Sequence, residues 1–65
     1  MTLTVNGVAE DLADGLTVGD LVRARTDQRK VAVARNGEVV PRSAWDDTVL
    51  ERGDTVEVLV AVAGG

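Results

Sequence analysis

Apolar and polar residues alternate along several short segments of the chain, and this period of two residues is typical of β-strands. Residues 1–5 alternate in this way and are followed by Asn6-Gly7. That dipeptide favours a tight hairpin turn, because both of its positions adopt positive φ. Residues 8–12 are therefore predicted to be the return strand. A second hairpin with the same turn chemistry is predicted from residues 31–34, Asn36-Gly37 and residues 38–40.

Between the two hairpins, the spacing of apolar residues changes to that of a helix. Val18, Leu21 and Val22 form one apolar stripe. Thr17 and Asp20 have the spacing of a capping box, in which the hydroxyl and the carboxylate accept the unpaired N–H groups of a helix start. The sequence predicts one short helix that begins after Thr17 and ends near residues 26–27.

The rest of the chain contributes a short helical turn and the longest strand. Residues 43–46 indicate the turn, and residues 55–62 alternate in the pattern of a strand. The order is hairpin, helix, hairpin, short turn and last strand. The helix stripe can be buried against one face of the sheet. We therefore expect a single domain over residues 1–65, an α+β fold of the β-grasp (ubiquitin-like) type with a mixed sheet of about five strands and one helix across it.

Composition narrows the possible chemistry. The 65 residues contain no cysteine and no histidine, which excludes a thiolate nucleophile and the usual general base. The net charge of −4 disfavours nucleic acid and makes a partner with a basic surface easier to accommodate. No signal peptide and no apolar run long enough for a bilayer is found, so we expect no membrane contact and a cytoplasmic location. Trp45, the only aromatic residue, is interpreted as part of the core.

The last strand has one face that the sequence predicts to be exposed. If the valines at 56, 58, 60 and 62 point inward, then Leu59 and Ala61 point outward. Ala32 and Ala34 are expected to lie beside them on the neighbouring strand. An exposed leucine among small residues suits docking against a partner. Leu59, Ala61 and the residues that follow are therefore predicted to be partner-binding residues.

The chain ends in Ala63-Gly64-Gly65, which we call the tail. Glycine-rich ends are commonly frayed and without function. Glycine also lets a backbone enter a narrow channel, so the tail can deliver the terminal carboxylate to an enzyme. A free carboxylate is a poor acyl donor, and a partner would have to convert it to an acyl-adenylate before sulfur could displace AMP.

Two segments resemble one known family. Residues 36–45, from Asn36 through Val40-Pro41-Arg42 to Trp45, are similar to a stretch of the thiamine-biosynthesis sulfur carriers of the ThiS family. Residues 53–65 resemble the ending of the same family, and the likeness extends over essentially the whole chain.

The resemblance implies a sulfur carrier without catalytic activity of its own. Gly65 would be adenylated by an enzyme related to ubiquitin E1, which uses ATP, and then thiocarboxylated with help from a sulfur-donating enzyme. The carrier would next donate its sulfur at thiazole synthase. This chain would bind no cofactor and no metal. Together with the exposed face of the last strand, the predicted partner-binding residues are Leu59, Ala61, Val62, Ala63 and Gly64.

Three alternatives stay open at the level of sequence. The same carrier chemistry can serve molybdopterin or cysteine synthesis. The chain can instead be a ubiquitin-like protein modifier, although Lys30 is its only lysine. It can also be an interaction module in which the terminal Gly-Gly has no role.

Overall fold

Both Asn-Gly dipeptides form the hairpin turns that the sequence predicts. In the computed structural model, which describes residues 1–61, Asn6 and Gly7 have φ of 50° and 81°, and Asn36 and Gly37 have φ of 52° and 84°. Four positive φ values in two adjacent pairs match the turn that joins closely spaced antiparallel strands. The two turns thus determine the register of the two hairpins.

Seven elements follow one another along the described part of the chain. They are β1 (Thr2–Val5), β2 (Val8–Asp11), α1 (Val18–Arg25), β3 (Val31–Arg35), β4 (Glu38–Val40), the 3₁₀ helix η1 (Arg42–Asp47) and β5 (Thr55–Val60). The predicted order of elements is confirmed. The ends differ from prediction by one or two residues, as expected where helices and strands fray.

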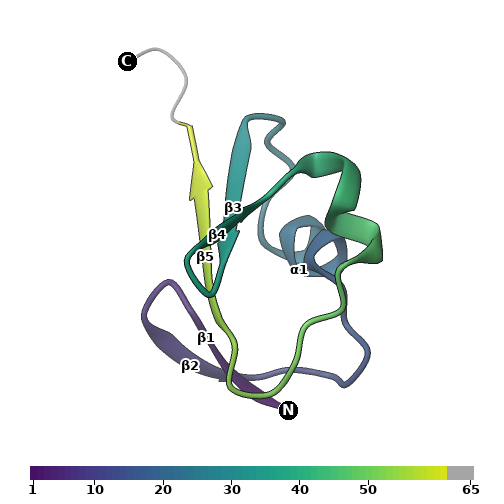
Figure 1. The fold of residues 1–65 in the computed structure, drawn as a ribbon. Coiled ribbons are helices and arrows are strands. Elements are labelled where there is room, and N and C mark those ends of the chain that lie inside the picture. The colour runs from purple at the N-terminus through teal and green to yellow at the C-terminus, as the bar shows by residue number, and fades with distance from the viewer. Residues whose placement is uncertain (62–65) are drawn as a thin grey trace.

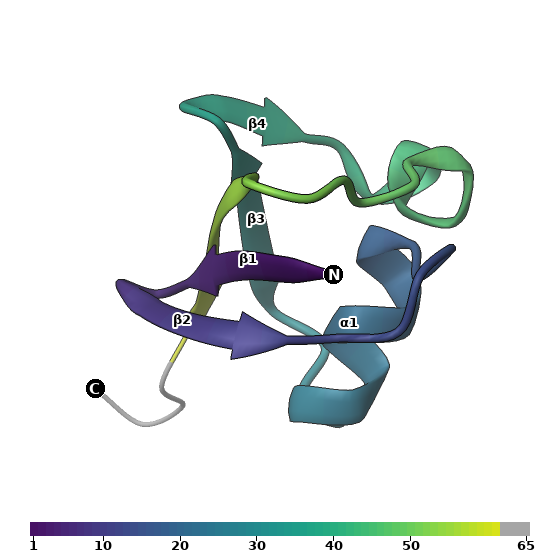
Figure 2. The same cartoon turned by 90° about the horizontal axis from the view of Figure 1, so that it is seen from below.

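The five strands form one mixed sheet in the order β2-β1-β5-β3-β4. β5 runs parallel to β1 and antiparallel to β3, and it lies at the centre of the sheet. The helix α1 lies on one side of the sheet, with η1 beside it (Figures 1 and 2). The expected α+β fold, a mixed five-stranded sheet with one helix across it, is confirmed.

The helix begins with the capping box that the sequence predicts. The Asp20 N–H donates to the Thr17 hydroxyl and the Thr17 N–H donates to the Asp20 carboxylate, both at 3.1 Å. Val18, Leu21 and Val22 are buried against the sheet. The last helical residue is Arg25, one residue before the predicted end.

The core lies between the sheet and the helix. Its buried members are Leu3, Val5, Val18, Leu21, Val22, Val33, Trp45, Leu50, Val56 and Val58. Trp45 is only 8% exposed, and its indole N–H donates to the Val40 carbonyl at 2.9 Å. The interpretation of Trp45 as a core residue is confirmed. No helix within residues 1–61 has the length and apolar character needed to cross a membrane.

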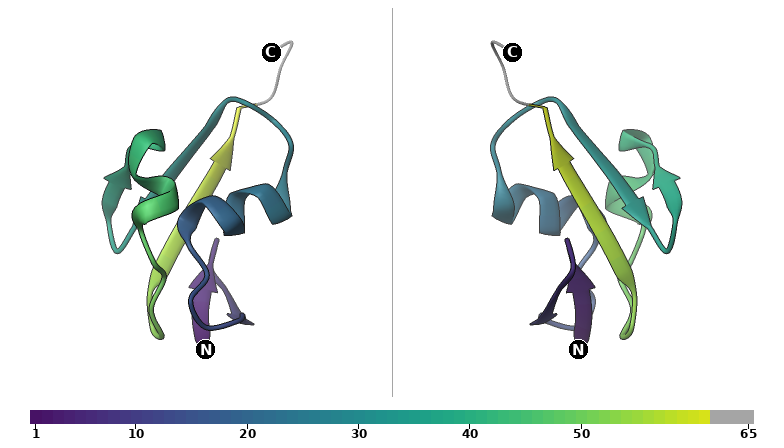
Figure 3. Two further views of the ribbon diagram at one scale, coloured as in Figure 1. Left: turned by 90° about the vertical axis from the view of Figure 1, so that its right-hand side faces the viewer. Right: turned by 90° about the vertical axis from the view of Figure 1, so that its left-hand side faces the viewer.

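The strand β5 connects the two ends of the molecule. It starts near Met1 and runs to the opposite end, where the connection between α1 and β3 also lies (Figure 3). The described chain therefore reaches Ala61 at the end farthest from Met1.

Candidate functional site at the end of strand β5

The functional residues predicted from the sequence lie on and after β5. Leu59 is 66% exposed, and Ala61 is also exposed. Val62, Ala63, Gly64 and Gly65 lie outside the described residues, so their predicted roles remain predictions. What the structure does show is the surface around the last described residue.

β5 is shorter than the sequence predicts. It ends at Val60, whereas the alternating pattern continues to Val62. Val60 is paired with Val31 and faces the same side as Val58, but it is 38% exposed rather than buried. The predicted inward direction of Val60 is therefore confirmed, but the described residues leave more of its side chain exposed than that of Val58.

The outer face of β5 carries an exposed apolar strip. Leu59 lies opposite Ala32 on β3, and Ala34 lies opposite Val39 on β4. Residues paired across a sheet point to the same face, so these four side chains share the side away from the helix. Val39 is 77% exposed. We call Leu59, Ala32, Ala34 and Val39 the outer strip.

Val39 is a member of the outer strip that the sequence reasoning missed. The signal was present in the two-residue turn at Asn36-Gly37, which pairs Ala34 with Val39 once the hairpin register is known. An exposed valine beside alanines extends the apolar surface from β5 across two neighbouring strands. The predicted outward placement of Leu59, with Ala32 beside it, is confirmed.

A shallow hollow lies at the end of β5 next to the outer strip. Its volume is about 400 Å³, and it is lined by Lys30, Val31, Ala32, Leu59, Val60 and Ala61. The N–H of Ala61 donates to the Lys30 carbonyl at 2.9 Å, so the last residue that the structure describes is still bonded to the residue just before β3. Most of the residues that line the hollow are apolar, and Lys30 is the one charged residue among them.

Asparagine side chains hold β5 from both sides. The Asn6 amide donates to the Val58 carbonyl at 3.1 Å and accepts from the Val58 N–H at 2.8 Å. The Asn36 amide accepts from the Thr55 N–H at 2.9 Å. Each side chain takes the place of a strand neighbour where the adjacent hairpin turns away. The backbone that leads to the tail is therefore fixed along its length.

A buried carboxylate anchors the start of β5. Asp54 is 5% exposed and accepts hydrogen bonds from Arg35 Nε at 2.8 Å, Asn36 Nδ2 at 3.1 Å and the Glu51 N–H at 2.8 Å. Burial by itself raises the pKa of Asp54, but the three donors together outweigh it and hold that pKa below its usual value. The charged form is thus the stable one in the folded protein.

Within residues 1–61, no group of three or more carboxylate, histidine or cysteine side chains is placed to hold a metal ion. This end of the molecule does present an exposed apolar surface beside a strand that side-chain hydrogen bonds hold in place.

The chain matches one family over nearly its whole length. The model of the ThiS family matches residues 3–65. The sulfur carrier protein ThiS of Escherichia coli is 34% identical over 67 residues, which cover all of both chains. A thiazole synthase of Paramagnetospirillum magneticum is 36% identical over 66 residues. The match covers all of this chain but only 20% of that longer protein.

Solved structures give the same fold. The crystal structure of the thiamine biosynthesis protein ThiS from Geobacter metallireducens superposes with a TM-score of 0.84 at 40% identity, covering all of both chains. The solution structure of a thiamine biosynthesis protein from that organism gives a TM-score of 0.82 at 43% identity, covering this whole chain and 88% of the other.

Proposed function

This chain belongs to the ThiS family, and from that membership we propose that it carries sulfur for thiazole formation in thiamine biosynthesis. The relatives that match over their full length are named for thiamine biosynthesis or for sulfur carriage in it. Those names favour the thiamine pathway over molybdopterin or cysteine synthesis as the destination of the sulfur. The site of this function is the end of β5 and the tail that follows it, and its setting is the cytoplasm.

The proposed chemistry takes place at the carboxylate of Gly65. An E1-like enzyme supplies ATP, and the carboxylate attacks the α-phosphorus, forming an acyl-adenylate and releasing pyrophosphate. A sulfur-donating enzyme releases its sulfur as sulfide, HS⁻, which attacks the acyl carbon, and AMP leaves with the electrons of the broken C–O bond. The product is a thiocarboxylate, whose sulfur passes to the forming thiazole at thiazole synthase. This chain acts as a cosubstrate throughout.

One observation supports this use of the tail most directly. The outer strip exposes Leu59 at 66% and Val39 at 77%, and it leads to the point where the chain leaves the sheet. Large apolar side chains that stand together on a surface mark an interaction site more reliably than single ones. A partner seated on the outer strip would hold β5 while it received the tail. The Asn6 and Asn36 bonds keep that strand in place.

Deleting Gly65 tests the proposal. We expect the shortened protein to unfold at the same urea concentration as the full chain, because Gly65 contributes no side chain. We also expect it to accept no sulfur, because displacement at the acyl carbon tolerates little misplacement. The measurement is the intact mass after incubation with ATP, the adenylating enzyme and a sulfur donor, where loading replaces one oxygen by sulfur.

Adding residues after Gly65 is a second test, which blocks the terminal carboxylate without shortening the chain. Such an extension turns the terminal carboxylate into an amide, so sulfur loading should be lost again while the fold is kept. Sulfur loading that survives either change would overturn the proposal. Conjugates that resist both reduction and thiol nucleophiles would instead identify a protein modifier.

A further inference from the structure

Three positive residues lie near the end of β5, in or beside the connection between α1 and β3. Arg29, Lys30 and Arg42 are all exposed. Among the described residues, the ion pairs of arginine side chains involve Arg23, Arg25 and Arg35, and none involves these three. We call Arg29, Lys30 and Arg42 the basic rim. The three side chains therefore carry positive charge that no carboxylate within residues 1–61 pairs with, in a chain whose net charge is −4.

Backbone contacts hold the basic rim beside the start of the tail. The Lys30 carbonyl accepts the Ala61 N–H at 2.9 Å, and Lys30 lines the hollow that Leu59 also lines. The Arg42 guanidinium donates to the Arg29 carbonyl and lies 4.7 Å from the centre of the Trp45 ring. An enzyme that takes up the tail must therefore approach Lys30 closely, and Arg29 and Arg42 extend the positive charge from Lys30 toward η1.

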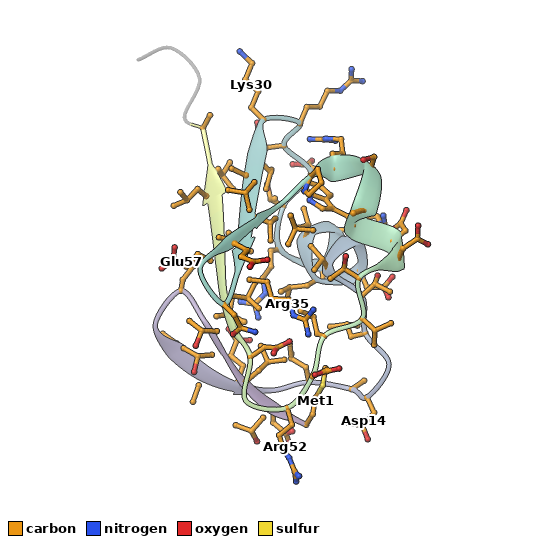
Figure 4. The ribbon with its side chains drawn as sticks, in the orientation of Figure 1. Met1, Asp14, Lys30, Arg35, Arg52 and Glu57 are labelled. Carbon is orange, nitrogen blue, oxygen red and sulfur yellow. The ribbon has the colours of Figure 1, made fainter. Side chains whose placement is uncertain are left out.

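The opposite end of the molecule has a different charge balance. Asp11 and Asp14 lie there with the Met1 ammonium, and Arg52 is nearby (Figure 4). At the β5 end, Asp27 is the one acidic residue in the connection between α1 and β3. The net charge of the whole chain thus conceals a local excess of positive charge where the tail begins.

We propose that the basic rim docks against an acidic surface around the opening through which thiazole synthase takes up the tail. This inference rests on the proposed function. Its partner is chosen because a thiazole synthase contains a region similar to this chain within one longer protein. Complementary charge at the edge of an interface speeds the encounter and orients it, while the apolar outer strip contributes the contact area. The net charge of −4 favours a partner with a basic surface, whereas for this end of the molecule we infer an acidic one.

Charge reversal at two matched positions tests the inference. Lys30→Glu changes the basic rim, and Arg52→Glu makes the same change in net charge at the far end, on another exposed cation outside the ion pairs of the described residues. The association rate constant with purified thiazole synthase of the same organism is measured by stopped-flow fluorescence at several salt concentrations. We expect Lys30→Glu to slow association by about three- to tenfold at low salt and Arg52→Glu by less than about twofold. High salt should reduce the difference between them.

Each result decides between named alternatives. Equal slowing by both variants would mean that only net charge matters, and faster association of Lys30→Glu would mean that the opposing surface is basic; either result overturns the inference. Lys30→Gln repeats the test if the glutamate variant shows a lowered melting temperature. If the unaltered chain takes up sulfur but does not bind thiazole synthase, the proposed acceptor and this inference both fail. If the unaltered chain binds thiazole synthase but takes up no sulfur, the proposed function fails while the docking of the basic rim can still be measured.

Discussion

Asn6 and Asn36 each have two roles, one in a hairpin turn and one in holding β5. Their positive φ values let the hairpins turn, and their side chains bond to β5, which is far from Asn6 in sequence. Asparagine adopts left-handed backbone geometry more easily than most residues, and its amide can donate and accept at once. Glycine would satisfy only the first purpose. The residue choice at these turns thus couples hairpin formation to the placement of the strand that carries the tail.

Asn6→Gly should separate the two purposes. The variant keeps a residue suited to positive φ but loses both bonds to Val58, so we expect a loss of about 1–3 kcal/mol in the free energy of unfolding. Asn6→Ala should lose roughly 1–2 kcal/mol more, because alanine is strained at φ 50°. Urea denaturation followed by Trp45 fluorescence measures both. Equal stability of Asn6→Gly and the unaltered chain would show that the two side-chain bonds contribute nothing net.

At the scale of an element, β5 shows how one strand serves two surfaces. Val56 and Val58 are buried under the helix, while Glu57 and Leu59 point to the other side. The alternation follows from the pleat, in which neighbouring side chains leave opposite faces. A shift of register by one residue would exchange these roles. The exposure of Leu59 confirms the predicted register.

The same substitution at adjacent positions should have opposite consequences. Val58→Asp places a carboxylate in the core and should lower the free energy of unfolding by roughly 3 kcal/mol or more. Leu59→Asp should lower it by no more than about 1 kcal/mol, since only strand propensity changes. Leu59→Asp should nevertheless weaken association with the adenylating enzyme, measured by isothermal titration calorimetry. Unfolding of the Leu59 variant, or unchanged binding, would contradict the role given to the outer strip.

At the scale of the whole molecule, charged groups hold both the first residue and the start of the last strand against the rest of the fold. The buried Asp54 joins the turn before β5 to Arg35 and Asn36. The Met1 ammonium donates to the Leu12 carbonyl at 2.7 Å and lies 3.2 Å from Asp14 and 3.3 Å from Asp11. Hydrogen bonds to Asp14 and then Asp11 raise the pKa of that ammonium above its usual value. The Asp54 carboxylate therefore loses its charge as pH falls, and the Met1 ammonium loses its charge as pH rises.

The free energy of unfolding should therefore decrease both at acid pH and at alkaline pH. The pKa of Asp54 is lowered by folding, so its contribution is present above about pH 4 and is lost as pH falls through the folded value. Asp20, whose pKa is lowered chiefly by the Thr17 N–H, acts in the same direction. The pKa of the Met1 ammonium is raised, so its contribution is present below about pH 8 and is lost as pH rises through the folded value.

Urea midpoints measured from acid to alkaline pH, on a chain beginning at Met1, check this profile. Asp14→Asn should flatten the alkaline decline and leave the acid decline unchanged. If the stability of Asp14→Asn decreases as strongly at alkaline pH as that of the unaltered chain, a group other than the Met1 ammonium is responsible.

Much of the architecture could be read from the sequence because its signals are local. The Asn-Gly turns, the Thr17–Asp20 capping box and the alternation along β5 each depend on residues within a few positions of one another. Local geometry and the period of apolar residues therefore predict the elements and their faces. The sequence also predicts Trp45 as a core residue, because an indole ring has a large apolar area to bury, and the structure confirms this.

What the tertiary structure alone decided is which distant segments meet. Nothing local shows that Asp54 accepts from Arg35, that Asn6 bonds to β5, or that Lys30 lies beside Ala61. The early end of β5 and the exposure of Val60 likewise depend on how far the helix reaches over the sheet. The alternation of side chains along a strand is a property of that strand, whereas burial, pairing and local charge depend on the neighbours that the fold brings to it.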